Sequence, residues 1–270
     1  MWICFVVLIA SSGVLLKLLV FDSWNANSIK EDAKGLYYES GKSEEENKFS
    51  SLLDENSDVF GWISIEGTNI DYPVLRSPKE DDDFYLYHNY KKEKSKYGSI
   101  FLNYNYDDPK EIKNTVLYGH HMADGQMFAD LMKFSDVDFY KEHPIIRFDT
   151  LNEEGNWKII SVFKTNTLRE QGDIFNYTVS SFSNSKKFVD YIEEVKKRSL
   201  INVPVIAEAD DKLLTLSTCS YEFKDFRTVV VARKVKVGES LEVDTSLASK
   251  SPNPLMPQCW YDRYGGVAPS

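Results

Sequence analysis

Cysteine is scarce in this sequence, and the scarcity excludes several classes of protein. Only three cysteines occur in 270 residues, Cys4, Cys219 and Cys259, and no two of them form a CxxC pair. A disulfide scaffold or a zinc site built on cysteine pairs is therefore not expected. The sequence also lacks an HExxH motif and a glycine-rich phosphate loop. We therefore expect neither a metal nor a cofactor.

Positive charge is also in short supply. The chain has 32 Lys and Arg residues against 42 Asp and Glu residues, a formal net charge of -10 at pH 7. No stretch of the sequence forms a basic stripe. Nucleic acid is excluded as the main partner, because a polyanion would be repelled by this chain.

A long apolar run occurs only at the N-terminus. Residues 2–21, WICFVVLIASSGVLLKLLVF, are apolar apart from two serines and one lysine, and a membrane-spanning helix needs about 20 such residues. Residues 1–21 are therefore predicted to be a membrane anchor. We expect a single-pass protein of the cell membrane whose main domain is extracellular.

The segments on either side of the main domain are polar. Residues 22–58 predict a juxtamembrane linker that leads into an amphipathic N-terminal helix, with Phe49, Leu52 and Leu53 at its apolar positions. Residues 239–270 contain Pro, Gly and Ser without periodicity. This composition predicts a flexible C-terminal tail.

Residues 59–238 consist mostly of short β-type runs separated by turns. The runs are GWISIEG, NIDYPVL, GSIFLNY, NTVLYGHH, PIIRFDT, NWKIISVFKTN, KLLTLSTC and RTVVVARKVKV. Eight such runs fit a closed β-barrel. Two runs with helical spacing, at 126–140 and 183–200, interrupt them. The predicted fold class is all-β with added helices. One helix is N-terminal, and another is inserted before the strand that contains Cys219.

One cysteine ends a strand-like run, and an arginine opens the next. In KLLTLSTC the side chains of Thr215, Ser217 and Cys219 face one way, because successive residues of a strand alternate between faces. If the following strand begins near Arg227 and returns antiparallel, the thiol lies beside the guanidinium. The two groups would then meet at the mouth of the barrel.

A nucleophilic thiol needs a proton partner from elsewhere in the chain. His88 and His143 lie in polar, loop-like surroundings, where a surface role is usual for histidine. His120 and His121 follow the run TVLYG, at a turn where side chains are held rigidly yet reach solvent. We predict that His120 is the proton partner of the thiol, and His121 is the second candidate. On the residues alone, an inert buried Cys219 is an equally good interpretation.

Four separated motifs in this sequence resemble those of a known family. TLSTC followed by an arginine, together with the upstream YGHHMADGQMF, resembles the sortases, and specifically the class B sortases. The similarity extends to GWISIEGTNIDYPVL and YGSIFLNYNY, so that it covers residues 59–238. The resemblance implies an eight-stranded sortase barrel over these residues.

The resemblance also implies roles for individual residues. Cys219 matches the nucleophile, His120 the general acid/base and Arg227 the catalytic arginine of the family. Further residues fall where side chains that line the sorting-signal groove are found; these are Ser217, Thr218 and Asn103.

The implied activity is that of a sortase-type cysteine transpeptidase, which is also a thiol protease. Such an enzyme cleaves a Thr-containing C-terminal sorting signal of surface proteins and joins the new carboxyl group to a peptidoglycan amine in a Gram-positive cell wall. Two alternatives stay open at this point. One is a cysteine peptidase that passes the acyl group to water, and the other is a wall-binding barrel without catalysis.

Overall fold

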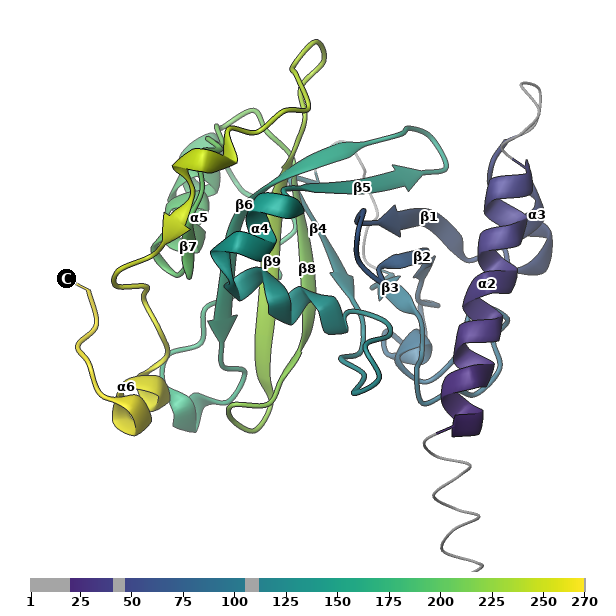
Figure 1. The fold of residues 1–270 in the computed structure, drawn as a ribbon, viewed down its shortest axis with the longest axis horizontal. Coiled ribbons are helices and arrows are strands. Elements are labelled where there is room, and N and C mark those ends of the chain that lie inside the picture. The colour runs from purple at the N-terminus through teal and green to yellow at the C-terminus, as the bar shows by residue number, and fades with distance from the viewer. Residues whose placement is uncertain (1–19, 41–46, 105–111, 270) are drawn as a thin grey trace, which may run out of the picture.

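The computed structural model describes residues 20–40, 47–104 and 112–269, and the barrel fills its centre (Figure 1). Eight strands close into a barrel in the order β1-β2-β3-β4-β8-β9-β6-β5. Their bounds are β1 Val59–Ser64, β2 Asp71–Arg76, β3 Ile100–Leu102, β4 Asn114–Tyr118, β5 Ile145–Thr150, β6 Asn156–Thr165, β8 Leu213–Ser220 and β9 Phe226–Lys234. A separate pair joins β7 (Ile201–Asn202) to β10 (Ser249–Lys250).

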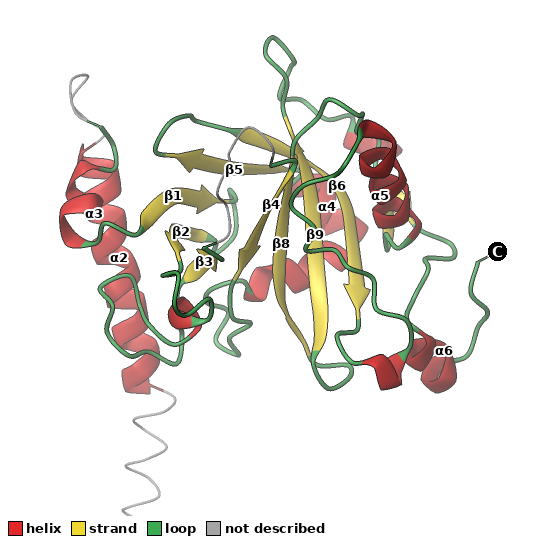
Figure 2. Ribbon diagram, turned by 180° about the vertical axis from the view of Figure 1, so that it is seen from behind, coloured by secondary structure: helices red, strands yellow, loops and turns green. Residues whose placement is uncertain are grey.

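Helices cover the barrel on several sides (Figures 1 and 2). The α-helices are α2 Asp22–Ser40, α3 Ser50–Glu55, α4 Val137–Glu142, α5 Ser185–Lys197 and α6 Gln258–Tyr264. The 3-10 turns are η2 Phe84–Leu86, η3 Ala129–Ser135, η4 Arg169–Gln171 and η5 Thr245–Leu247. Helix α2 stands beside β1 and β2, whereas α5 lies across the barrel from it (Figure 2).

Strand alternation divides the apolar residues of β8 and β9 between two cores. Leu214 and Leu216 of β8 and Val230 of β9 belong to the cluster inside the barrel. Their neighbours Leu213 and Val229 belong to a second cluster, under α5. Because every second residue of a strand faces the same side, both faces of these central strands are buried over most of their length.

A third core joins the N-terminal helices to β1. The Tyr37 ring of α2 stacks on Trp62 of β1, with centroids 4.4 Å apart and ring planes 4° apart. The Tyr37 hydroxyl donates to Asp149 at 2.8 Å, which satisfies the polar tip of a buried ring. These contacts fix α2 against the side of the barrel.

The structure confirms the predicted barrel with added helices. All eight barrel strands overlap the eight predicted runs, and α5 lies within the predicted helix at 183–200. The sequence pattern missed α2, which occupies most of the segment predicted as a linker. Its polar composition hides it, because only one narrow stripe that includes Ala33 and Tyr37 is buried.

The predicted single-pass membrane localisation is corrected by the structure. Among residues 20–40, 47–104 and 112–269, no helix combines the length and the apolar character needed to cross a bilayer. Most of the predicted anchor, residues 1–19, lies outside the described residues.

Candidate active site

Three neighbouring strands of the barrel end at the same place. Strand β4 pairs in parallel with β8, with Tyr118 opposite Ser217. His120 lies two residues beyond Tyr118 in the sequence, and Cys219 lies two residues beyond Ser217. Strand β9 returns antiparallel to β8 with Arg227 opposite Cys219. Paired residues point their side chains to the same face of a sheet. The thiol and the guanidinium therefore share one face at one end of the barrel, and His120 follows the end of the adjacent strand β4.

The backbone around His120 is fixed on both sides. The Thr218 hydroxyl donates to the Gly119 carbonyl at 2.8 Å, and the Phe128 amide donates to the His120 carbonyl at 2.9 Å. A Cβ atom at position 119 would lie 2.4 Å from Cδ1 of Ile100. This turn therefore needs a glycine before the histidine.

The ring of His120 is oriented by a carbonyl of the segment that follows β2. Its Nε2 lies 2.7 Å from the Leu86 oxygen. Because a carbonyl only accepts, Nε2 carries the proton. Nδ1 is then the basic nitrogen of the neutral ring. Nothing in the residue pattern pointed to Leu86.

Cys219 and Arg227 line an open cleft of about 550 Å³. Both side chains are partly exposed, so that a substrate can reach them. Nη1 of Arg227 donates to the Phe226 carbonyl at 3.1 Å, which holds one edge of the guanidinium at the start of β9. The other walls of the cleft come from the loop that joins β8 to β9, residues 221–225, and from Arg263 of α6.

The second candidate histidine has a different position. Nδ1 of His121 donates to the Cys219 carbonyl at 3.2 Å, and its ring stacks on Tyr221 with centroids 4.8 Å apart. The Tyr221 hydroxyl in turn donates to the His121 carbonyl at 2.8 Å. His121 thus braces the cysteine strand against the loop that follows His120.

The residues predicted to bind substrate do not all lie together. Ser217 and Thr218 directly precede Cys219 on β8, and both are buried. Asn103 follows β3, which runs antiparallel to β4 with Phe101 opposite Tyr118. By this register it lies level with Val116, in the middle of β4, further from the Cys219 end of the barrel than Tyr118.

Sequence reasoning missed a buried tyrosine beside the site. The Tyr177 hydroxyl lies 2.9 Å from the Ser217 hydroxyl. Burial raises the pKa of Tyr177, while the hydrogen bond with Ser217 and the charge of Arg227 act in the opposite direction. Tyr177 is therefore neutral and closes the face above Ser217. It lies in the long segment between β6 and α5, which carries no motif.

A partly buried ion pair lies beneath the β8–β9 loop. The Lys164 ammonium of β6 binds the Glu222 carboxylate, and Ser220 also donates to that carboxylate. Burial acts to raise the pKa of Glu222, but the hydrogen bonds from Lys164 and Ser220 lower it below its usual range. Glu222 is thus held as a carboxylate and fixes the middle of the loop.

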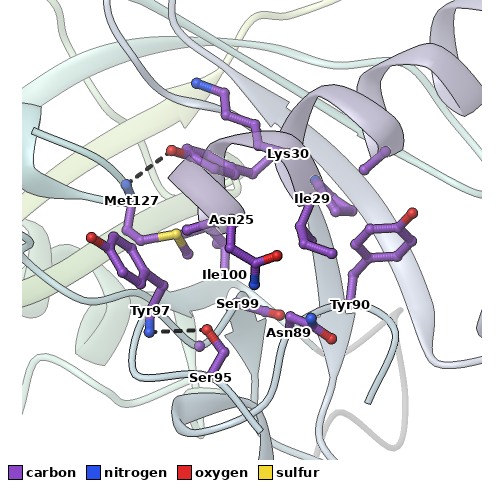
Figure 3. A pocket seen from close by; sticks show the side chains of 15 residues that line it. Asn25, Ile29, Lys30, Asn89, Tyr90, Ser95, Tyr97, Ser99, Ile100 and Met127 are labelled. Atoms are coloured by element: carbon purple, nitrogen blue, oxygen red, sulfur yellow. Dashed lines mark hydrogen bonds between the residues drawn. The ribbon is translucent and has the colours of Figure 1, made fainter. Parts of the chain in front are cut away.

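Helix α2 contacts the loop that follows His120, and Asp124 is the centre of this contact. Its carboxylate accepts from Ser23 of α2 at 2.6 Å and from Tyr97 at 2.6 Å. The small cavity between α2 and the barrel holds only about 40 Å³ and includes Met127, whose amide donates to the Tyr72 hydroxyl (Figure 3). It is too small for a substrate, so this surface is a docking contact within the chain.

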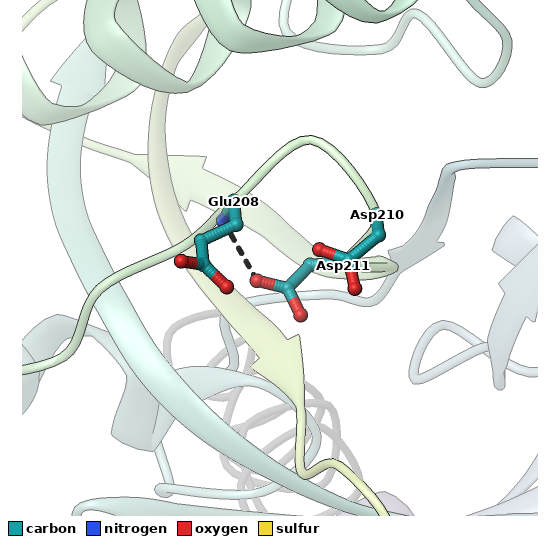
Figure 4. Close-up of side chains that lie close together, drawn as sticks. All are labelled: Glu208, Asp210 and Asp211. Atoms are coloured by element: carbon teal, nitrogen blue, oxygen red, sulfur yellow. Dashed lines mark hydrogen bonds between the residues drawn. The ribbon is translucent and has the colours of Figure 1, made fainter.

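Three carboxylates gather before β8, but a lysine already occupies their centre. Glu208, Asp210 and Asp211 have oxygen atoms within 4.8 Å of one another (Figure 4). The Lys236 ammonium donates to Glu208 at 2.7 Å and lies 3.4 Å from Asp211. The cluster is therefore a network of ion pairs that joins β8 to the end of β9.

Known proteins match the part of the chain that forms the barrel. Residues 63–235 match the family model described as a sortase domain. Sortase B of Listeria monocytogenes is 36% identical over 220 residues, which cover 80% of this chain and 86% of that protein. Sortase B of Staphylococcus aureus is 35% identical over 192 residues, which cover 70% of this chain and 75% of that protein.

A solved structure has the same fold. The Staphylococcus aureus sortase B-substrate complex has a TM-score of 0.72 and 31% identity, and the match covers 81% of this chain and all of that one.

Proposed function

We propose a reaction for this chain from the premise that it belongs to the sortase family, as a class B sortase. It is a cysteine transpeptidase that cleaves a Thr-containing C-terminal sorting signal of surface proteins. It then joins the new carboxyl group to a peptidoglycan amine. The observation that carries this proposal is that Cys219 pairs with Arg227 across β8 and β9, while His120 follows the end of β4, the strand on the other side of β8.

The first half of the reaction forms a thioester. The Cys219 thiolate attacks the threonine carbonyl carbon, a carbon–sulfur bond forms, and the carbonyl electrons move onto oxygen. The Arg227 guanidinium, which carries a fixed positive charge, stabilises that oxyanion. The intermediate then breaks its carbon–nitrogen bond, and the His120 imidazolium donates a proton to the departing amine. The products are a thioacyl enzyme and a neutral His120.

The second half passes the acyl group to an amine. The acceptor amine attacks the thioester carbonyl, and neutral His120 takes the proton that the amine loses. The second tetrahedral intermediate expels the Cys219 thiolate and leaves a new peptide bond. Each cycle therefore restores the thiolate and imidazolium, and the thioester conserves the energy of the cleaved bond.

Supporting observations come from the site and from a relative. Lys164 holds the β8–β9 loop through Glu222, and Thr218 holds the turn at Gly119, which preorganises the reacting groups. The related staphylococcal structure is described as a sortase B-substrate complex. A peptidase that hydrolyses the thioester would use the same three residues, so the fate of the thioester distinguishes the two activities.

Intact mass spectrometry of the full chain tests the proposal. The protein is mixed with a panel of Thr-containing sorting-signal peptides, with and without an amine acceptor, and Cys219→Ala is the control. We expect a covalent adduct that is absent in the variant and a ligated product that forms only with the amine. Conversion of every adduct to hydrolysed peptide would identify a peptidase. Lack of any adduct across the panel would leave the barrel as a binding module.

A further inference from the structure

The C-terminal segment reaches the cleft that contains Cys219. Helix α6 lies beside the β8–β9 hairpin (Figure 1), and its Arg263 lines the same cleft as the thiol. Nη1 of Arg263 donates to the Glu222 carbonyl at 2.8 Å. An arginine that lies 36 residues beyond Arg227 in the sequence therefore becomes part of the wall of the cleft.

Aromatic packing fixes α6 in this position. Trp260 stacks on Phe226 at 6.4 Å and lies 6.3 Å from Phe223 of the loop. On the other side, a Cβ atom at position 172 would lie only 2.9 Å from the Gln258 amide nitrogen. Gly172 has a φ of 122°, so this close approach of the helix start depends on a glycine.

The cleft is locally positive in a chain whose net charge is -10. Its cationic side chains are Lys224, Arg227 and Arg263, and its carboxylates are Glu222 and Asp225. Glu222 is already neutralised by Lys164. Three cations therefore face one remaining carboxylate, and among the ion pairs of the described residues none involves Arg263. The excess charge fits an anionic group.

The two sides of the thiol differ in what they offer a substrate. On one side lies Ser217, one of the residues assigned to the sorting signal, which is covered by Tyr177. On the other side, the open cleft extends from Cys219 to Arg263. An amine that enters from this side can reach the thioester while a negative group of the same molecule contacts Arg263.

We infer that Arg263 recognises a carboxylate on the acyl acceptor, so that the preferred acceptor is an amine that carries a carboxylate a short distance away. This inference rests on the proposed function. A guanidinium suits this task because it offers paired donors to a carboxylate and keeps its charge at all relevant pH values. Arg227 is left to stabilise the oxyanion.

Matched acceptors test the inference on the full chain. Triglycine and triglycinamide have amines in the same chemical setting and differ only at the far end, where one has a carboxylate and the other a neutral amide. Diglycine and its amide test a shorter span. The measured quantity is the ratio of ligated to hydrolysed peptide from the same thioacyl enzyme. Because the site is partly open, we expect the carboxylate to raise this ratio about five- to ten-fold.

Substitutions of Arg263 test whether this residue causes the preference for an acceptor with a carboxylate. Arg263→Ala should make the acid and the amide equal acceptors, while the rate of thioester formation from the sorting peptide stays the same. Arg263→Lys should keep part of the preference, since the charge remains without the planar fork. Lys250→Ala, at an exposed position on β10, should keep all of it.

Several outcomes would refute the role of Arg263 while the proposed transpeptidase activity would still stand. One is equal transfer to the acid and the amide at both lengths by the unmodified protein, and another is an unchanged preference in Arg263→Ala. A third is an equal loss of thioester formation and transfer in Arg263→Ala, which would make Arg263 a support of the loop. Failure of the unmodified protein to form any thioester would instead refute the proposed function, and with it this inference.

Discussion

The two ends of the barrel contain cavities of similar size but different character. The cleft at Cys219 holds about 550 Å³ and is lined mostly by polar and charged side chains. The opposite cavity holds about 470 Å³, and aromatic residues such as Phe60, Phe148 and Trp157 form much of its wall. Volume therefore does not identify the reactive end. The proposed reactive residues distinguish the two ends instead, because Cys219 lies near the end of β8, Arg227 near the start of β9 and His120 just after β4.

The two ends are also stabilised differently. At the reactive end, hydrogen bonds and an ion pair from separate segments hold the loops, as Lys164 does for Glu222. At the opposite end, Trp157 and Phe148 belong to the apolar core of the barrel. We therefore expect substitutions at the opposite end to cause the largest losses of stability, and substitutions of the proposed reactive residues to lower the reaction rate.

Trp157→Ala should have the largest effect of these substitutions, and the effect should be a loss of stability. The side chain is only 6% exposed, so its removal leaves a cavity that costs about 3–5 kcal/mol of the free energy of unfolding. Denaturant unfolding measures this loss, with Val237→Ala at a fully exposed position as the control. The folded fraction should form thioester at the normal rate. A slower rate of thioester formation by folded Trp157→Ala would show that the opposite end also affects the reaction.

Arg227→Lys should lower the turnover of the enzyme and leave its stability unchanged. Lysine keeps a positive charge but lacks the planar pair of donors, and loss of one oxyanion donor lowers turnover by about 10²- to 10³-fold. The rate of adduct formation with a sorting peptide measures this effect. The unfolding midpoint should stay unchanged, because Arg227 is partly exposed. Turnover equal to that of the unmodified protein would refute the oxyanion role.

Glu222→Gln should destabilise the protein in a pH-dependent way. The folded state lowers the pKa of Glu222, so its ion pair contributes full stability above the unfolded pKa, near pH 4.3. That contribution is lost as the pH falls through the lower folded pKa. Because Glu222 is partly exposed, we expect a difference of about 1–2 kcal/mol at neutral pH.

Unfolding of both proteins between pH 7 and pH 3 measures this linkage. The stability difference should be constant in the upper part of the range and shrink below about pH 4.3. A difference that grows on acidification would have the wrong sign for a carboxylate whose folded pKa is lowered.

Asn103→Ala should have the smallest effect. The sequence resemblance assigns Asn103 to the sorting-signal groove, whereas the direction of β3 carries it toward the opposite end. We expect KM and kcat for the peptide to change by no more than about two-fold, as for most surface substitutions. Ser217→Ala, beside the nucleophile, is the comparison. A large rise in KM for Asn103→Ala alone would show that the groove extends along the whole barrel.

The strands were predictable because their signals are local. β-Branched and aromatic runs between turns located all eight barrel strands. The short spacing between Cys219 and Arg227 allows only a tight antiparallel return, and the structure has this pair in register. The helix α2 was not predictable from its own composition, because it is stabilised by the distant partners Trp62 and Asp149.

Sequence alone therefore determined the fold class and the family, and it supplied the three proposed reactive residues, since each depends on residues that are close in the chain or that recur as motifs. Tertiary structure decided which side chains surround them. The Leu86 carbonyl at His120, Tyr177 at Ser217 and Arg263 in the cleft all come from segments with no motif. The physical reason is that closure of the barrel and docking of the chain ends create these contacts, and neither is encoded in any single stretch of residues.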